Sequence, residues 1–72
     1  MFEKRLNKAL SMNLKNNDEI INYCKKEAAK NYSDRKCHDL QCICEYLLYK
    51  LNNNVTFYEY QRLQFEGVIL SE

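Results

Sequence analysis

Residues 33–51 read SDRKCHDLQCICEYLLYKL, and they decide the fold class because they carry the longest helical pattern in the chain. At about 100° per residue, the aliphatic residues and two cysteines fall on one side of this helix, which we expect to be buried. That side comprises Cys37, Leu40, Ile43, Cys44, Leu47, Leu48 and Leu51. The opposite side is more polar, and we expect it to face solvent. It comprises His38, Asp39, Cys42, Glu45, Tyr46 and Tyr49.

The remaining sequence predicts shorter helices that pack against this one. Ser33 is suited to cap the long helix, and the asparagine run at 52–54 ends it, because Asn tolerates the left-handed conformation. The predicted helices span about residues 2–14, 18–31, 34–52 and 57–66. Short connections between helices favour an all-α fold, namely a small antiparallel bundle of three to four helices. We expect residues 1–72 to form a single domain.

Local capping signals support the second and fourth helices. Asn16 or Asn17 precedes two acidic residues and is suited to cap the second helix. Thr56 and Glu59 have the spacing of a capping box, and Gly67 is suited to a left-handed stop. One side of the fourth helix is expected to carry Phe57, Tyr60, Gln61, Gln64 and Val68.

The composition of the chain limits the possible fold classes and cellular compartments. The chain has 72 residues, one glycine and no proline, so it lacks the turn residues that a β-sheet needs. A core this small favours self-association, and we expect a homodimer. No run of residues is apolar enough to cross a membrane, and the N-terminus does not resemble a secretory signal, so we expect a cytoplasmic protein with reduced thiols.

Catalytic and metal sites are not indicated. The single glycine excludes phosphate-binding loops, and the single histidine leaves acid–base chemistry to scattered carboxylates. His38 and Cys42 are adjacent on the polar side of the long helix, but zinc sites usually draw paired ligands from separate turns. We therefore predict no catalytic residues, no metal and no cofactor.

Nucleic-acid binding is the alternative function. The net charge is only +1, but residues 1–36 carry nine basic and five acidic side chains. A basic patch is predicted on the second helix and the turn into the third. It comprises Lys25, Lys26, Lys30, Arg35 and Lys36. A small regulator could contact phosphates through these residues.

Aromatic residues favour a protein partner instead. Six tyrosines and three phenylalanines exceed what a small core uses, and exposed tyrosines are common at interfaces. We predict a non-catalytic protein-interaction module whose binding face is His38, Cys42, Tyr46 and Tyr49. The Asn-, Lys- and Tyr-rich composition is typical of AT-rich genomes, which leads to the hypothesis of a phage or mobile-element inhibitor of a host enzyme or defence complex, acting in the host cytoplasm.

Overall fold

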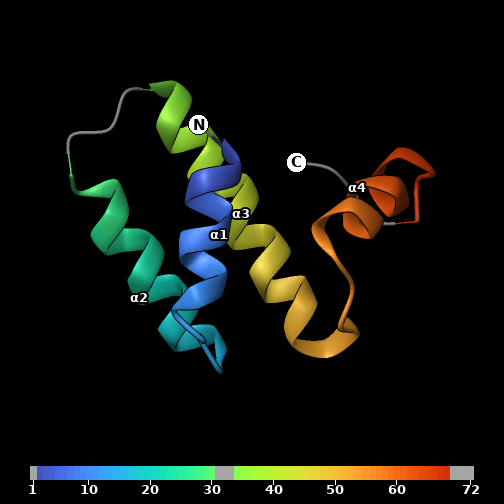
Figure 1. The fold of residues 1–72 in the computed structure, drawn as a ribbon, viewed down its shortest axis with the longest axis horizontal. Coiled ribbons are helices and arrows are strands. Elements are labelled where there is room, and N and C mark those ends of the chain that lie inside the picture. Colours follow the sequence, from blue (N-terminus) through green and yellow to red (C-terminus); the bar gives the residue numbers. More distant parts are fainter. Residues whose placement is uncertain (1, 31–33, 69–72) are drawn as a thin grey trace.

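The computed structural model describes residues 2–30 and 34–68, without the side chain of Arg35. This part of the chain contains α1 (Phe2–Ser11), α2 (Asn17–Ala28), α3 (Asp34–Asn53) and α4 (Phe57–Phe65), and no strand. Figure 1 shows α1 and α2 on one side of α3 and α4 on its other side, with α2 antiparallel to α1 and α3. The predicted all-α bundle is confirmed.

The predicted helix starts are confirmed at two places. The Asn16 side chain accepts a hydrogen bond of 2.9 Å from the backbone N–H of Glu19, so Asn16 is the N-cap of α2. At α4, the Thr56 hydroxyl accepts from the Glu59 backbone N–H, while the Glu59 carboxylate accepts from the Thr56 backbone N–H. This reciprocal arrangement satisfies donors that a helix start leaves without partners. The proposed capping role of Ser33 lies outside the described residues.

Among the described residues, left-handed residues follow α1, α3 and α4. Asn54 has a φ of 38° after α3 and Gly67 a φ of 79° after α4, as predicted. Asn13 also has a positive φ, 57°, and α1 therefore ends at Ser11 rather than at residue 14. Left-handed backbone cannot continue a right-handed helix, so these residues set the helix ends.

The core forms around α3, which packs against α1 and α2 on one side and against α4 on the other. Ile43 of α3 and Ile20 of α2 are almost completely buried, and α1 packs beside them. The other buried apolar residues are Leu6, Ala9, Leu40, Tyr46, Leu47 and Tyr60. Cys37 and Leu51, predicted to be buried, are exposed near the two ends of α3, because this 20-residue helix is longer than the helices packed against it.

The prediction that the polar side of α3 faces solvent is wrong for Tyr46. Its side chain is only 1% exposed, and its hydroxyl donates a 2.7 Å hydrogen bond to the carbonyl oxygen of Val55. Its ring lies 5.2 Å from Phe57 and 5.4 Å from Tyr60. Tyr49 is half-buried and lies 5.4 Å from Tyr60. Both tyrosines are covered because α4 packs on this side of α3.

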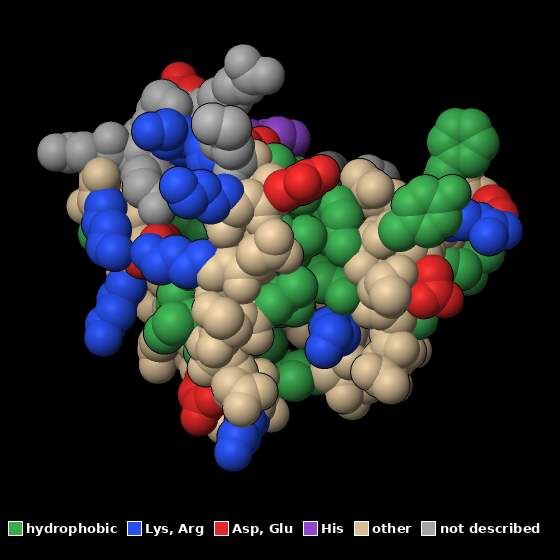
Figure 2. Space-filling model, in the orientation of Figure 1, with side chains coloured by type: hydrophobic (Ala, Val, Ile, Leu, Met, Phe, Trp, Pro, Cys, Tyr) green, Lys and Arg blue, Asp and Glu red, His purple; other side chains and the backbone are tan. Residues whose placement is uncertain are grey.

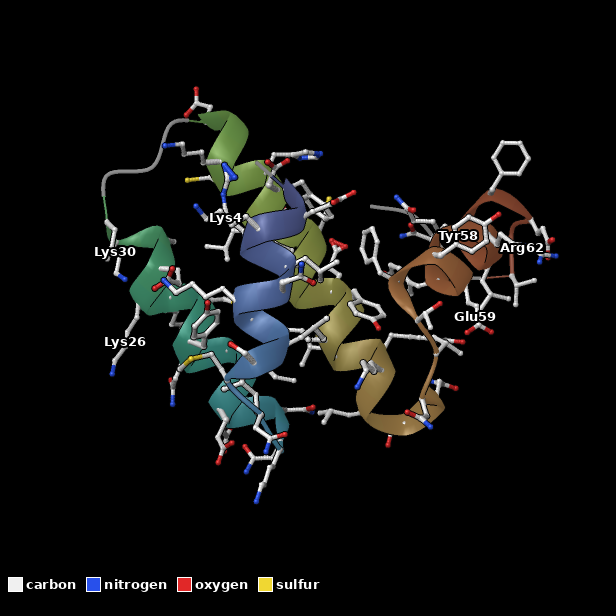
Figure 3. All side chains as sticks on the ribbon, viewed as in Figure 1. Lys4, Lys26, Lys30, Tyr58, Glu59 and Arg62 are labelled. Carbon is white, nitrogen blue, oxygen red and sulfur yellow. A yellow bond between two sulfur atoms is a disulfide. The ribbon has the colours of Figure 1, made fainter. Side chains whose placement is uncertain are left out.

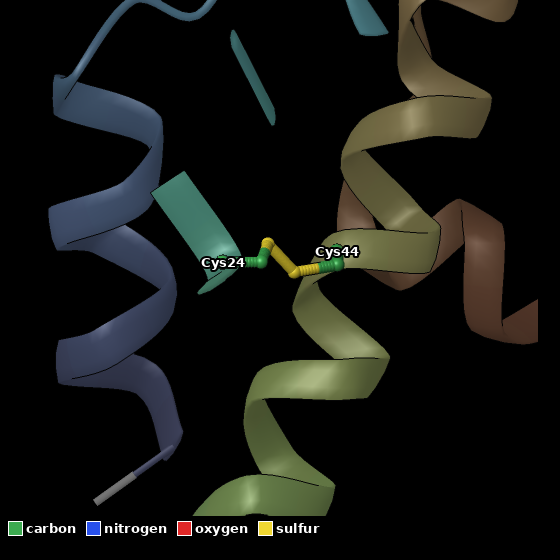
Figure 4. Close-up of a disulfide and its surroundings, with 2 residues drawn as sticks. All are labelled: Cys24 and Cys44. Atoms are coloured by element: carbon green, nitrogen blue, oxygen red, sulfur yellow. A yellow bond between two sulfur atoms is a disulfide. The ribbon is translucent and has the colours of Figure 1, made fainter. Parts of the chain in front are cut away.

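The prediction of four reduced thiols is also wrong. Cys24 of α2 and Cys44 of α3 form a disulfide, with 6.5 Å between their Cα atoms (Figure 4). This separation lies within the usual range for disulfides. Cys37 and Cys42 keep their thiols. The disulfide therefore links α2 to α3 covalently, whereas α1 and α4 lie outside the cross-linked loop and, within the described residues, contact the bundle non-covalently.

Replacing Tyr46 by Phe removes the hydroxyl and leaves the Val55 carbonyl without its donor. We expect the free energy of unfolding to fall by about 1–2 kcal/mol, the usual cost of breaking such a bond. Urea denaturation followed by circular dichroism measures the change. Tyr58→Phe is the matched control, since Tyr58 is 70% exposed, and it should leave stability unchanged. Equal effects of the two substitutions would contradict the assigned hydrogen bond.

Reducing the Cys24–Cys44 disulfide frees a loop that spans 20 positions of the sequence. A cross-link of this length stabilises a protein by about 3 kcal/mol in the chain-entropy account. A non-thiol reductant should therefore lower the urea midpoint, and thiol titration in denaturant should count two thiols before reduction and four after it. The Cys24→Ser/Cys44→Ser variant should not respond to the reductant; four thiols before reduction would contradict the disulfide.

Candidate functional site

A groove lies between α3 and α4, and Phe2 at the start of α1 also lines it. It has a volume of about 310 Å³. We refer to it as the α3–α4 groove. It is lined by Phe2, His38, Asp39, Cys42, Glu45, Phe57, Tyr60, Gln61 and Gln64.

Aromatic rings form the apolar part of the groove. The ring of Phe2 lies 5.1 Å from that of Phe57, and Phe57 lies 6.2 Å from Tyr60. The Tyr60 hydroxyl accepts a 3.3 Å hydrogen bond from the Gln64 amide. Tyr46 contacts the rings of Phe57 and Tyr60, and Phe57 in turn contacts Phe2. Tyr60 is only 5% exposed, so the accessible ring surface of the groove comes mainly from Phe2 and Phe57, which are half-buried.

Carboxylates form the polar part of the groove. Asp39 and Glu45 of α3 both line it and are half-buried. Asp39 makes an ion pair of 3.8 Å with Arg5 of α1, which holds its side chain against the bundle. Within the groove lining itself there are two carboxylates and no Lys or Arg. Because Arg5 offsets the charge of Asp39, the negative charge of the groove comes mainly from Glu45.

Cys42 and His38 lie together at the polar edge of the groove. The Cys42 Sγ atom is 3.8 Å from His38 Nε2. Burial raises the pKa of the Cys42 thiol, and the negative charges of Glu45 and Asp39 raise it further. A raised pKa keeps the sulfur protonated near neutral pH and makes it a poor nucleophile. Residues 2–30 and 34–68 contain no cluster of three or more His, Cys, Asp or Glu side chains that could hold a metal.

The structure divides the four residues predicted to bind a partner. His38 and Cys42 line the α3–α4 groove, whereas Tyr46 lies in the core below it and Tyr49 packs against Tyr60. Tyr46 is therefore not available to a partner. A helix wheel of α3 shows only the residues of α3, so it could not place Phe2, Phe57 or Tyr60 in this site. The sequence did place Phe57 and Tyr60 on one side of the fourth helix, and in the structure these two residues face α3.

The predicted basic patch lies on a different face. Lys25 and Lys26 of α2, Lys30 just after it and Lys36 of α3 are exposed, and the side chain of Arg35 lies outside the described residues. Basic side chains from α1 extend this surface, as Figures 2 and 3 show for the side bearing Lys4, Lys26 and Lys30. A cavity of about 490 Å³ opens here between α1, α2 and α3. Its lining is Lys4, Arg5, Lys8, Tyr23, Glu27, Lys36 and Leu40.

A buried carboxylate partly neutralises this basic surface. The Glu27 side chain is 8% exposed and lies 2.7 Å from the Lys30 ammonium and 3.4 Å from that of Lys8. The Lys8–Glu27 pair ties α1 to α2, and both ion pairs offset part of the local positive charge. The basic surface is thus a structural network as well as a candidate anion-binding face.

Comparison with protein-family models, curated proteins and solved structures finds no match for this chain. None of the described helices is both long enough and apolar enough to span a lipid bilayer.

Neutralising Glu45 tests the electrostatics of the groove. Because its charge raises the pKa of Cys42, Glu45→Gln should lower that pKa and increase the thiolate fraction at a given pH. Alkylation of Cys42 should then become severalfold faster below its pKa, with the pH profile shifted to lower pH. Mass spectrometry in a Cys37→Ser background measures the rate. Asp18→Asn removes a charge on α2 and serves as the control; an unchanged profile for Glu45→Gln would contradict the assignment.

Proposed function

We propose that this protein is a non-catalytic protein-interaction module whose α3–α4 groove receives a basic side chain of a partner protein. The observation that carries the proposal is the pairing of ring surfaces from Phe2, Phe57 and Tyr60 with the carboxylates of Asp39 and Glu45 in one groove. A Lys or Arg side chain matches both features. Its charge interacts with carboxylates, and its cationic end is attracted to aromatic faces.

The size of the groove supports recognition of side chains rather than of a large ligand. Its volume of about 310 Å³ is at the low end of the range of small-molecule sites, about 300–1,000 Å³. The rings are fixed by core contacts with Tyr46, so little ordering is needed on binding. A preformed groove of this kind is suited to one or two anchor side chains of a partner segment.

The chemistry of Cys42 supports a binding role in preference to a catalytic one. A catalytic thiol is normally activated by a lowered pKa, and the pKa of Cys42 is raised. Its contact with His38 is long, at 3.8 Å. We propose that these two side chains form the polar edge of the binding groove.

The hypothesis of a phage or mobile-element inhibitor concerns the identity of the partner and rests on composition alone. We propose a pull-down from host lysate in parallel with the Asp39→Asn/Glu45→Gln variant and the Asp18→Asn control. A partner of the groove should be retained by the wild type and the control and lost, at least tenfold, with the double variant. Bound partner should also slow alkylation of Cys42. A protein retained equally by all three would contradict binding through the groove.

Nucleic-acid binding through the basic surface is the second candidate. The observation that favours it is the convergence of basic side chains from three helices, including Lys4, Lys26, Lys30 and Lys36, around one cavity and its surroundings. Phosphate contacts weaken steeply with salt. If this candidate holds, Lys4→Ala/Lys26→Ala should weaken binding to a mixed-sequence duplex and reduce the slope of log affinity against log salt, while Glu45→Gln should not. The absence of duplex binding at low salt would exclude it.

A further inference from the structure

The outward side of α4 carries an exposed stripe that neither the core nor the groove uses. Tyr58, Arg62 and Phe65 are four and three residues apart, so they share one side of the helix. Phe65 is 94% exposed and Tyr58 is 70% exposed. Val68, 68% exposed, follows just beyond the helix. In Figures 2 and 3, apolar side chains and Arg62 stand out from α4 away from the other helices. We call Tyr58, Arg62 and Phe65 the outer stripe.

The outer stripe adjoins the α3–α4 groove but faces mainly away from it. Phe57, Tyr60 and Gln64 line the groove, and at about 100° per residue they lie about 80–160° away from Tyr58 and Phe65 around the helix. Gln61 also lines the groove and lies only about 40–60° from these two residues, so it marks the border between the two surfaces. Substitutions at Phe65 and at Glu45 change one surface each, so they test the two surfaces separately.

We propose that the outer stripe is the two-fold interface of a homodimer, in which two α4 helices pack antiparallel and Tyr58 contacts the partner's Phe65. The occupant is thus a second copy of this chain. This proposal goes beyond the binding role of the groove and does not depend on it.

The spacing of the two aromatic residues supports a symmetric pair. In a two-fold interface the same patch occurs on both subunits, so each residue and its contact are exchanged by the symmetry. Tyr58 and Phe65 lie at equal distances on either side of the point between residues 61 and 62, close to the middle of α4 (Phe57–Phe65). When two such helices pack antiparallel about that point, Tyr58 meets the partner's Phe65 at both ends. Both contacts are aromatic pairs, which are favourable beyond the area that they bury.

The charges beside the stripe are also self-complementary. Arg62 lies near the proposed two-fold axis, where it approaches its own symmetry copy. Glu59 and Glu66 lie on the same flank of the helix, and Glu66 already pairs with Arg62 at 3.4 Å within one chain. In the dimer, four carboxylates would surround two guanidinium groups. The repulsion between the two arginines is therefore compensated, and each Arg62 can pair across the interface with a carboxylate of the partner.

The exposed area is sufficient for a small dimer. An aromatic side chain buries about 150–250 Å², so Tyr58, Phe65 and Val68 together offer about 400–500 Å² per subunit. Complete burial of these side chains in two subunits would amount to about 800–1,000 Å². Stable specific interfaces bury about 1,200–2,000 Å², and smaller ones are typical of weak, transient association. We therefore expect a weak dimer that dissociates reversibly.

Sedimentation of the purified 72-residue chain over about 1–300 µM tests the proposal. We expect a reversible monomer–dimer equilibrium in that range, and at least a tenfold higher dissociation constant for Phe65→Ser. Met12→Ser is the matched control, because Met12 is also an exposed apolar residue, 50% exposed, but lies after α1. Circular dichroism should be unchanged in both variants, since neither side chain is in the core. A chain that is monomeric throughout, or a dimer that Phe65→Ser leaves intact, would overturn the proposal.

Cross-linking tests the antiparallel arrangement. Tyr58→Cys and Phe65→Cys variants, each with Cys37→Ser and Cys42→Ser, are mixed and treated with a short bis-maleimide. The mixed dimer keeps one native aromatic pair and brings the two introduced thiols together, so it should be the main cross-linked product by mass spectrometry. Predominant linkage between two copies of the same variant would show a different arrangement and refute the antiparallel interface.

Discussion

The position of Tyr46 is the constraint on which the rest of this structure depends. A buried phenol needs a partner for its hydroxyl, and Tyr46 finds it in the carbonyl oxygen of Val55, just before α4. The hydrogen bond fixes the connection between α3 and α4, and the ring supports Phe57 and Tyr60. Burial raises the pKa of Tyr46, and the charge of Glu59 raises it further, so the hydroxyl remains a donor. The α3–α4 groove and the exposed stripe of α4 both follow from this contact.

The sequence predicted the features that depend on neighbouring residues. The caps at Asn16 and Thr56, the left-handed stops at Asn54 and Gly67, and the all-α class all follow from local chemistry, and they are confirmed. The docking of α4 depends on residues distant in sequence. A helix wheel places Tyr46 and Tyr49 on the polar side of α3. Because tyrosine is compatible with both water and a core, the wheel does not show that these two side chains are covered. The long helix has two packing sides, and a single apolar stripe cannot reveal the second.

The candidate site was predicted only in part for the same reason, because it depends on contacts between helices that are distant in sequence. His38 and Cys42 were identified from α3 alone, and they do line the groove, but its rings come from α1 and α4. The disulfide was missed for a different reason. Cys24 and Cys44 each resemble a small apolar residue on an amphipathic helix, and only the packing of α2 on α3 brings their Cα atoms within 6.5 Å. The charged side chains also separate by surface: lysines gather around α2, whereas Asp39 and Glu45 line the groove.

The disulfide has a consequence for the motion of the chain. It joins α2 to α3, whereas α1 and α4 both lie outside the cross-linked loop. Proteins open locally where fewer constraints hold a segment, so we expect α1 and α4 to open more readily than α2 and α3. Amide hydrogens of α4 should exchange before those of α2 and α3. A ligand in the groove binds only when α4 is docked, so it slows that exchange by linkage. Occupancy of the groove is thereby coupled to the order of the helix that forms one of its walls.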